Sequence, residues 1–229
     1  MIKKTVGILR TGYMGGKLAE DHGEFPEMFI DMLGADSFNY RTYSVIDGEF
    51  PDNTDDCDAW IITGSKHGAY EDHPWIEPLE AFIQKLANSQ QPTVGICFGH
   101  QIMAQALGGK VEKFDGGWGV GPQIYKEIKT GKTATLLAFH QDQVTECPPG
   151  AEITHTSDFC NIAGLRYSST CWSLQPHPEH TPAFTKDLIN QRRGQLLPEE
   201  TAVAALDKLP EKNDQNTYGT RIKNALNQG

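Results

Sequence analysis

The stretch Val94-Gly95-Ile96-Cys97-Phe98-Gly99-His100-Gln101 decides how this chain is expected to fold. A β-branched run at 93–96 reads as a buried strand, and the segment 102–107, which Gly108-Gly109 closes, reads as a helix. Cys97 therefore stands on a strand-to-helix turn with a glycine two residues to each side, which is the thiol version of a nucleophile elbow. A turn this sharp strains the backbone of its central residue and lifts that side chain out of the sheet.

The same turn favours reactive sulfur chemistry at Cys97. The sulfur lies over the positive end of the helix that begins there, which favours the thiolate over the thiol. The backbone N–H of Phe98 has no partner within that helix and can hold a developing oxyanion. A lone cysteine is more commonly a small buried hydrophobe, but the flanking glycines and the strand–turn–helix context favour a nucleophile here.

Composition bounds the class of protein. The 229 residues are enough for one α/β domain with a sizeable core and an appendage. Lys and Arg total 20 against 30 Asp and Glu, and this net charge of −10 argues against nucleic acid or an anionic membrane as partner. The five cysteines are widely spaced and form no CxxC pair, which suits free thiols in a reducing cytosol, so we expect a cytoplasmic protein. The apolar run 6–9 is too short for a signal peptide, and no later run reaches membrane-spanning length.

The segments before the elbow alternate between two hydrophobic patterns. Strands are expected over 5–9, 40–46, 58–63 and 93–96, and helices with an apolar stripe over 26–33 and 74–86. This alternation implies right-handed βαβ units and a parallel sheet. Ligands of such sheets bind beyond the carboxyl ends of the strands, where both Gly64-Ser65 and Cys97 stand.

The second half of the chain changes character. Short strands separated by turns are expected over 122–129, 134–139, 152–156, 161–167 and 171–175, with a loop at 116–121. A helix follows from 182 to about 193, 198–209 is expected to be a surface helix, and the last twenty residues are expected to be a frayed polar tail. The predicted fold is therefore α/β: a three-layer, mostly parallel sheet flanked by helices, with an antiparallel excursion in the second half. We expect one domain over 1–196, followed by a helical extension and polar tail over 197–229.

A glycine-rich stretch near the start of the chain resembles a phosphate loop but does not match one. A Walker A motif needs Gly-x4-Gly-Lys-[Ser/Thr], whereas Thr11 replaces the first glycine and Leu18 follows the lysine. We therefore expect a plain connection between a strand and a helix, and no nucleotide cofactor.

Eight histidines suggest a metal site, but their spacing does not support one. The run His177-x-Glu179-His180 is not His-Glu-x-x-His, and neither His67 nor His73 has a cysteine or carboxylate at ligand spacing nearby. We expect no metal and no other cofactor.

A candidate base for the cysteine follows the last predicted strand. In the run His177-Pro178-Glu179 the two titratable residues are two apart, so in extended backbone their side chains point the same way. Glu179 can then accept from one ring nitrogen of His177 while the other faces a nucleophile. The sequence thus offers Cys97, His177 and Glu179 as a catalytic triad.

Taken together, the two motifs resemble those of the class I glutamine amidotransferases. The resemblance rests on GICFGHQ at 95–101 and QPHPE at 175–179, and it covers roughly residues 5 to 195. It implies that Cys97 is the nucleophile, His177 the base and Glu179 its orienter. It also implies a second oxyanion donor on a loop after an earlier strand, where the N–H of Gly64 or its neighbour Ser65 would act with that of Phe98.

The resemblance extends to residues that would hold a substrate. Gln101 matches a glutamine that helps to hold it. The segment FHQDQV at 139–144 resembles the Ser-His-Gly-Asp-x-Val segment of GMP synthetase amidotransferase domains. That match assigns Asp142 to the substrate α-amino group and His140 to the pocket wall. Trp118 and Gly119 lie where the family places backbone contacts to the substrate.

One loop departs from the family pattern. Residues 66–70 (KHGAY) replace the glycine-proline-serine run of GMP synthetase. The loop 64–70 has two glycines and no obvious anchor, so we expect it to be partly open until a partner docks.

Three functions remain open at this stage. A glutamine amidotransferase would hydrolyse a γ-glutamyl amide through a thioester and pass ammonia to a separate synthetase subunit, because the chain has no second domain large enough for one. A γ-glutamyl hydrolase or peptidase would cut γ-glutamyl conjugates with the same triad, which the altered loop favours. A non-catalytic binding or stress-response protein on a related fold is the third, and the intact His177 and Glu179 argue against it.

Overall fold

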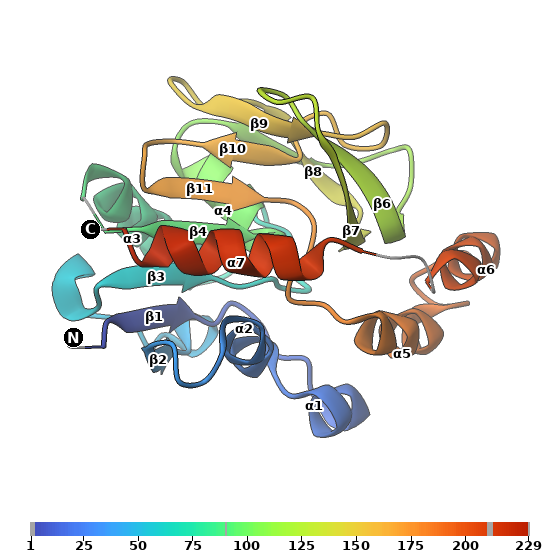
Figure 1. Ribbon diagram of the computed structural model, residues 1–229, viewed down its shortest axis with the longest axis horizontal. Coiled ribbons are helices and arrows are strands. Elements are labelled where there is room, and N and C mark those ends of the chain that lie inside the picture. The colour runs from blue at the N-terminus through green and yellow to red at the C-terminus, as the bar shows by residue number, and fades with distance from the viewer. Residues whose placement is uncertain (1–2, 90, 210–212, 229) are drawn as a thin grey trace.

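The computed structural model describes residues 3–89, 91–209 and 213–228. Within these residues a nine-stranded sheet runs through the molecule (Figure 1). In order across the sheet its strands are β2 (Asn39–Tyr43), β1 (Thr5–Leu9), β3 (Ala59–Ile62), β4 (Thr93–Ile96), β11 (Cys171–Leu174), β10 (Gly164–Arg166), β9 (Glu152–Thr156), β6 (Gly119–Glu127) and β7 (Thr133–His140). The pairs from β2 to β11 are parallel, and those from β11 to β7 are antiparallel. The expected α/β class with an antiparallel excursion is confirmed, and the sheet as a whole is mixed.

The parallel half is buried on both faces, because its strands carry apolar side chains on both. In β3, Trp60 and Ile62 belong to the core on one face, while Ala59 and Ile61 belong to the core on the other. The helices that cover the two faces are α3 (Ile76–Asn88) and α4 (Phe98–Ala106) on the first, and α2 (Phe25–Leu33) and α7 (Gln215–Leu226) on the second. Figure 1 shows α2 and α7 in front of the sheet and α3 and α4 behind it.

The C-terminal part of the chain differs from the expected frayed tail. Residues 215–226 form α7, whose Tyr218, Ile222 and Leu226 are buried in the core shared with α2. These side chains recur every four residues, so the otherwise polar helix has one apolar face that reaches the sheet. The expected tail is therefore wrong for this segment. Residues 210–212 and 229 lie outside the described residues, and the boundary between 196 and 197 stays a prediction.

Several further elements complete the fold. They are α1 (Gly16–His22), the separate antiparallel ribbon of β5 (Lys110–Lys113) with β8 (Asp142–Glu146), α5 (Pro182–Arg192), α6 (Glu199–Lys208), and two short 3-10 turns at Val45–Asp47 and Thr54–Asp56. The sequence predicted α5 and α6 but neither α1 nor the ribbon. β6 begins at Gly119, inside the expected loop. None of the helices in the described residues is both long and apolar enough to cross a membrane.

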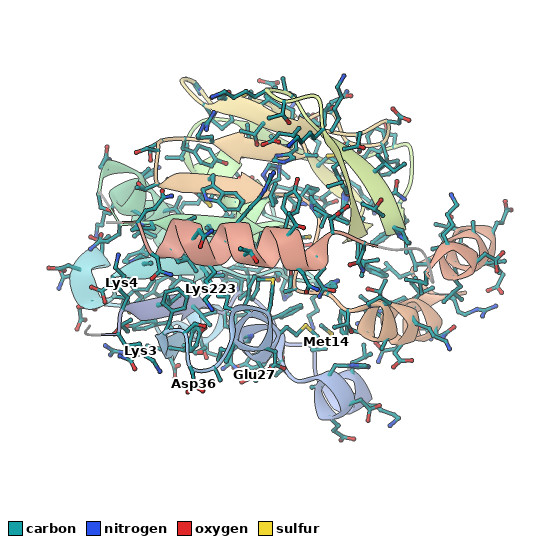
Figure 2. The ribbon with its side chains drawn as sticks, in the orientation of Figure 1. Lys3, Lys4, Met14, Glu27, Asp36 and Lys223 are labelled. Atoms are coloured by element: carbon teal, nitrogen blue, oxygen red, sulfur yellow. The ribbon has the colours of Figure 1, made fainter. Side chains whose placement is uncertain are left out.

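Helices from both ends of the chain meet beside the carboxyl ends of the parallel strands. Leu18 of α1, Met28 of α2, and Phe184 and Leu188 of α5 form a small apolar cluster there. Met14 packs against this cluster and is labelled in Figure 2, where the same helices come together. Leu188 of this cluster and the adjacent Met14 line the pocket described next.

Candidate active site

Cys97 occupies a strained turn between β4 and α4. Its φ of 53° and ψ of −103° make it the one non-glycine residue with positive φ in the described part of the chain. The glycines beside it are required by close backbone crossings. A Cβ at Gly95 would stand 2.5 Å from the Gly99 carbonyl oxygen, and one at Gly99 would stand 2.3 Å from that of Ile62. The structure thus has the elbow that the sequence predicts, with the strain located at the sulfur-bearing residue.

His177 and Glu179 lie together immediately after β11. Nδ1 of His177 donates to Oε1 of Glu179 at 2.7 Å, and both side chains are buried. The backbone N–H of His177 donates to the Leu137 carbonyl at 2.8 Å, which ties this turn to β7. A buried carboxylate at Nδ1 leaves Nε2 free to act and stabilises the imidazolium.

The electrostatics of His177 link it to Cys97 as well. Burial lowers the pKa of His177, but the negative charges and hydrogen bonds of Cys97 and Glu179 outweigh that effect and raise the pKa to about 10. The three groups therefore favour an imidazolium at neutral pH, the partner that a thiolate needs. The structure brings together all three residues of the expected triad.

The two residues expected to supply the oxyanion donors, Phe98 and Gly64, lie next to Cys97. Phe98 is the first residue of α4, so no turn of the helix pairs its N–H. Gly64 follows β3 and lies against the triad, since a Cβ there would stand 3.2 Å from Cε1 of His177 and 3.9 Å from Cβ of Cys97. The hydroxyl of Thr11 donates to the Gly64 carbonyl at 2.9 Å and holds that oxygen in place.

Sequence reasoning missed Gln175, which connects the sulfur to the predicted substrate residues. Nε2 of Gln175 donates to Sγ of Cys97 at 3.6 Å, and Oε1 accepts from Nε2 of Gln101 at 3.2 Å. Gln101 also donates to the backbone carbonyl of Asp142 at 2.9 Å. The fully buried Gln175 stands in the QPHPE motif, so the signal was present in the sequence.

The loop 64–70 is anchored, and the expected partly open loop is wrong. The hydroxyl of Ser65 donates to the Thr11 carbonyl at 2.8 Å, and Nε2 of Gln105 donates to the Ala69 carbonyl at 2.7 Å. The Tyr70 hydroxyl reaches across to Oδ1 of Asp142 at 3.2 Å. These anchors come from residues far away in sequence, so no local pattern indicated them.

A pocket of about 430 Å³ opens in front of the triad. Its wall includes Cys97 and His177 and, among the expected substrate residues, Gln101, Trp118, His140 and Asp142. Gly119 is not part of this wall: it pairs with His140 in the sheet, and a Cβ there would stand 2.8 Å from the Phe159 ring. Gly119, which was expected to offer backbone contacts to the substrate, thus lies behind the wall. Its lack of a side chain leaves room for the Phe159 ring.

Burial shifts the pKa of two polar side chains of this wall. Burial lowers the pKa of His140 to about 3, so its imidazole is neutral, and Nδ1 lies 3.2 Å from the Asp142 carbonyl oxygen. Burial raises the pKa of Asp142, against the hydrogen bond from Tyr70 and the charge of Lys113. Asp142 is the half-buried acid in a position to meet a cationic group.

His180 was also missed, although it adjoins Glu179 in the sequence. Its ring stacks on that of His177, with centroids 3.8 Å apart and planes at 6°. Burial and the charge of His177 lower the pKa of His180 well below its usual value, so it stacks as a neutral ring. Phe184 packs edge-on against its other side at 4.5 Å.

A separate histidine–carboxylate group, His67, Glu71 and His73, lies on the loop 64–70 and the residues directly after it. Oε2 of Glu71 stands 3.3 Å from Nδ1 of His67 and 2.7 Å from Nε2 of His73. The expectation that these histidines have no nearby carboxylate is wrong. A turn in which the Glu71 N–H donates to the Gly68 carbonyl at 3.1 Å brings them together.

The sequence of the chain is similar to those of known proteins. The family model of class I glutamine amidotransferases matches residues 37–192. γ-Glutamyl peptidase 5 of Arabidopsis thaliana is 32% identical over 184 residues, which are 74% of this chain and 73% of that protein. The carbamoyl phosphate synthase small chain of Agrobacterium fabrum is 36% identical over 129 residues, 54% of this chain and 32% of that one.

The fold of the chain is also similar to that of a solved structure. The crystal structure of a glutamine amidotransferase from Methylobacillus flagellatus superimposes with a TM-score of 0.77 at 19% identity, over 99% of this chain and 93% of that one. The elbow, the topology and the matched residues 37–192 agree, and the chain belongs to the class I glutamine amidotransferase family.

Proposed function

We propose that this protein hydrolyses γ-glutamyl amide bonds through a covalent thioester on Cys97, and that its substrates are γ-glutamyl peptides or conjugates rather than free glutamine. The observation that carries the proposal is the buried His177–Glu179 pair beside a strained elbow cysteine. Each of these three residues has one role in acyl transfer, and Cys97 and His177 face the same pocket.

The chemistry follows from these positions. The Cys97 thiolate attacks the γ-carbonyl carbon, and the oxyanion is held by the N–H groups of Phe98 and Gly64. The His177 imidazolium protonates the leaving amine, which departs and leaves a γ-glutamyl thioester. The neutral His177 then takes a proton from water, whose oxygen attacks the thioester carbonyl and releases glutamate and the thiolate. Glu179 stabilises each imidazolium state.

The glutamyl part would be held by the polar end of the pocket. We assign the Asp142 carboxylate to the substrate α-ammonium group, because it is the acid beside the triad whose oxygen Tyr70 fixes at 3.2 Å. Gln101 supports it from behind through the Asp142 carbonyl. His140 is neutral and packs as wall.

The outer part of the pocket favours a leaving group larger than ammonia. Apolar side chains from α5 and its surroundings line this part, namely Met14, Trp118, Phe139, Leu188 and Leu196. Three cations also line the pocket: Lys66, Lys113 and Arg192. Such a surface gains little from ammonia but can bury the side chain of a peptide or an apolar conjugate. The relative named γ-glutamyl peptidase 5 supports the same assignment.

A substrate comparison tests the proposal. We expect kcat/KM for a γ-glutamyl dipeptide with an aromatic second residue to exceed that for glutamine by at least about tenfold, since one apolar contact contributes about 1–3 kcal/mol. Cys97→Ser should abolish both reactions while the circular dichroism spectrum is unchanged. Equal kcat/KM values for the two amides would contradict the preference. Turnover of neither by the wild-type protein would favour the non-catalytic alternative.

A second candidate is a glutaminase that feeds a separate synthetase subunit. The observation that favours it is the 36% identity to a carbamoyl phosphate synthase small chain. Under this alternative, glutamine hydrolysis would be slow alone and would rise on addition of a partner protein. The anchored loop 64–70 argues against such gating, because Gly64 already lies beside the triad.

A further inference from the structure

We propose that His67, Glu71 and His73 form a binding site for one Zn²⁺ ion, with water as a further ligand. Their ligand atoms are Nδ1, Oε2 and Nε2, and all three lie within 4.8 Å of one another. Tetrahedral zinc with ligands at about 2.0–2.1 Å separates its ligand atoms by about 3.3 Å. The observed separation of 3.3 Å between Oε2 and His67 matches this spacing, and the 2.7 Å to His73 is shorter and would have to widen to admit the ion.

The donor set suits zinc among the common divalent ions. Two imidazole nitrogens with one carboxylate are typical of Zn²⁺ sites, whereas Mg²⁺ and Ca²⁺ prefer oxygen ligands throughout. The chain's net charge of −10 also favours a cation.

The surroundings already hold the ligands in place. His73 stacks on the Trp75 indole with centroids 5.8 Å apart and planes at 10°, and His67 packs edge-on against the same ring at 6.0 Å. The His73 N–H donates to the Glu71 carbonyl at 3.0 Å, which closes a second turn. Aromatic packing and backbone bonds thus orient the rings, as outer partners do in zinc sites.

The site has an entrance, and two of its residues, His67 and Glu71, line the same pocket as Cys97. The side chains of His67, Glu71 and His73 are 22%, 43% and 31% exposed, so an ion can enter from solvent. They belong to the segment that includes Tyr70, the partner of Asp142. A bound ion would clamp this segment, and the site takes no atom from the triad. The proposal therefore stands whether or not the proposed function holds.

Metal titration of the full chain tests the site. Cys97→Ala serves as the background, because it removes the thiolate that could help the second close group, His177, Glu179 and His180, to hold an ion. After chelator treatment we expect one equivalent of Zn²⁺ by calorimetry. With Co²⁺ we expect the visible absorption of a four-coordinate nitrogen and oxygen site. Zinc should also slow amide hydrogen exchange over residues 65–73.

Substitution of the ligands decides the location. Glu71→Gln and His73→Asn should each weaken Zn²⁺ binding by at least the roughly 10–100-fold that the loss of an outer partner costs. The matched control is His22→Asn, which removes another histidine–carboxylate pair, with Asp187, and should leave the affinity unchanged. Affinity that neither ligand variant alters, or no saturable uptake in the Cys97→Ala background, would overturn the proposal. Circular dichroism checks that each variant is folded.

Discussion

Gln175 directs its amide nitrogen at the sulfur of Cys97, 3.6 Å away, while its amide oxygen accepts from Gln101 at 3.2 Å. A buried amide in this position stabilises negative charge on the sulfur without donating a proton that the reaction would need back. It also couples the nucleophile to the side of the pocket where a glutamyl group would bind.

The first prediction concerns this contact. Because a hydrogen bond to a charged group contributes about 1.5–3 kcal/mol, Gln175→Met should slow alkylation of Cys97 by iodoacetamide and lower kcat/KM by about tenfold to a hundredfold. The matched control is Gln84→Met, which removes a 2.9 Å bond to the Ala106 carbonyl between α3 and α4. Alkylation of Gln175→Met at the wild-type rate would show that the amide has no part in activating the sulfur.

The second prediction is a pH profile. The His177 imidazolium must give a proton to the leaving amine, so activity falls as pH rises through its pKa, which its partners raise from 6.5 to about 10. The alkaline limb of kcat/KM should therefore lie near pH 10, and the NMR titration of His177 should have the same midpoint. Glu179→Gln removes one raising charge and should move both toward lower pH. An alkaline limb near pH 6.5 in the wild-type protein would rule out this electrostatic account.

The third prediction separates recognition from chemistry. Asp142→Asn should raise KM by about tenfold or more with kcat little changed, because an ion pair to the α-ammonium group is made equally in ground and transition states. Tyr70→Phe, which loses only the 3.2 Å bond to Asp142, should produce a smaller rise. Steady-state kinetics on a γ-glutamyl dipeptide measures both. A loss confined to kcat would assign Asp142 to the chemical step.

The fourth prediction tests the role of α7. Ile222 is a fully buried residue of this helix, so Ile222→Ala should lower the free energy of unfolding by about 2–5 kcal/mol. Val203→Ala on α6 is the control, since that side chain is 41% exposed and its loss should change stability by less than about 0.5 kcal/mol. Urea unfolding compares the two. Similar stabilities for both variants would mean that α7 is dispensable to the sheet.

The features predicted best from sequence are those whose signal is local. Two glycines and a change from a strand pattern to a helix pattern predict the elbow at Cys97. A two-residue spacing is enough to predict the His177–Glu179 pair. The helix at 215–226 was missed because its three buried side chains stand among polar ones. These side chains are recognisable as the buried face of a helix only when the positions of α2 and the sheet, which cover them, are known.

The missed parts of the site depend on contacts between distant segments. Gln105 anchors Ala69 from α4, and Tyr70 meets Asp142 from the opposite side of the pocket. Glu71 joins two histidines only because a turn reverses the chain at Gly68. The contacts of Gln105 and Tyr70 follow from how the completed fold places its loops, so no spacing rule encodes them. The contacts of Glu71 are local, within four residues of each histidine.

The central claim is that Cys97 carries the acyl group, and direct observation of the intermediate tests it most simply. The wild-type protein is mixed with a γ-glutamyl dipeptide, quenched in acid within one turnover, digested and mapped by mass spectrometry. We predict a γ-glutamyl adduct on the peptide that contains Cys97, absent in Cys97→Ser, with the other four cysteines unmodified. Hydrolysis of the dipeptide with no adduct on Cys97 under any quench, or with equal labelling of Cys57, Cys147, Cys160 and Cys171, would contradict the account.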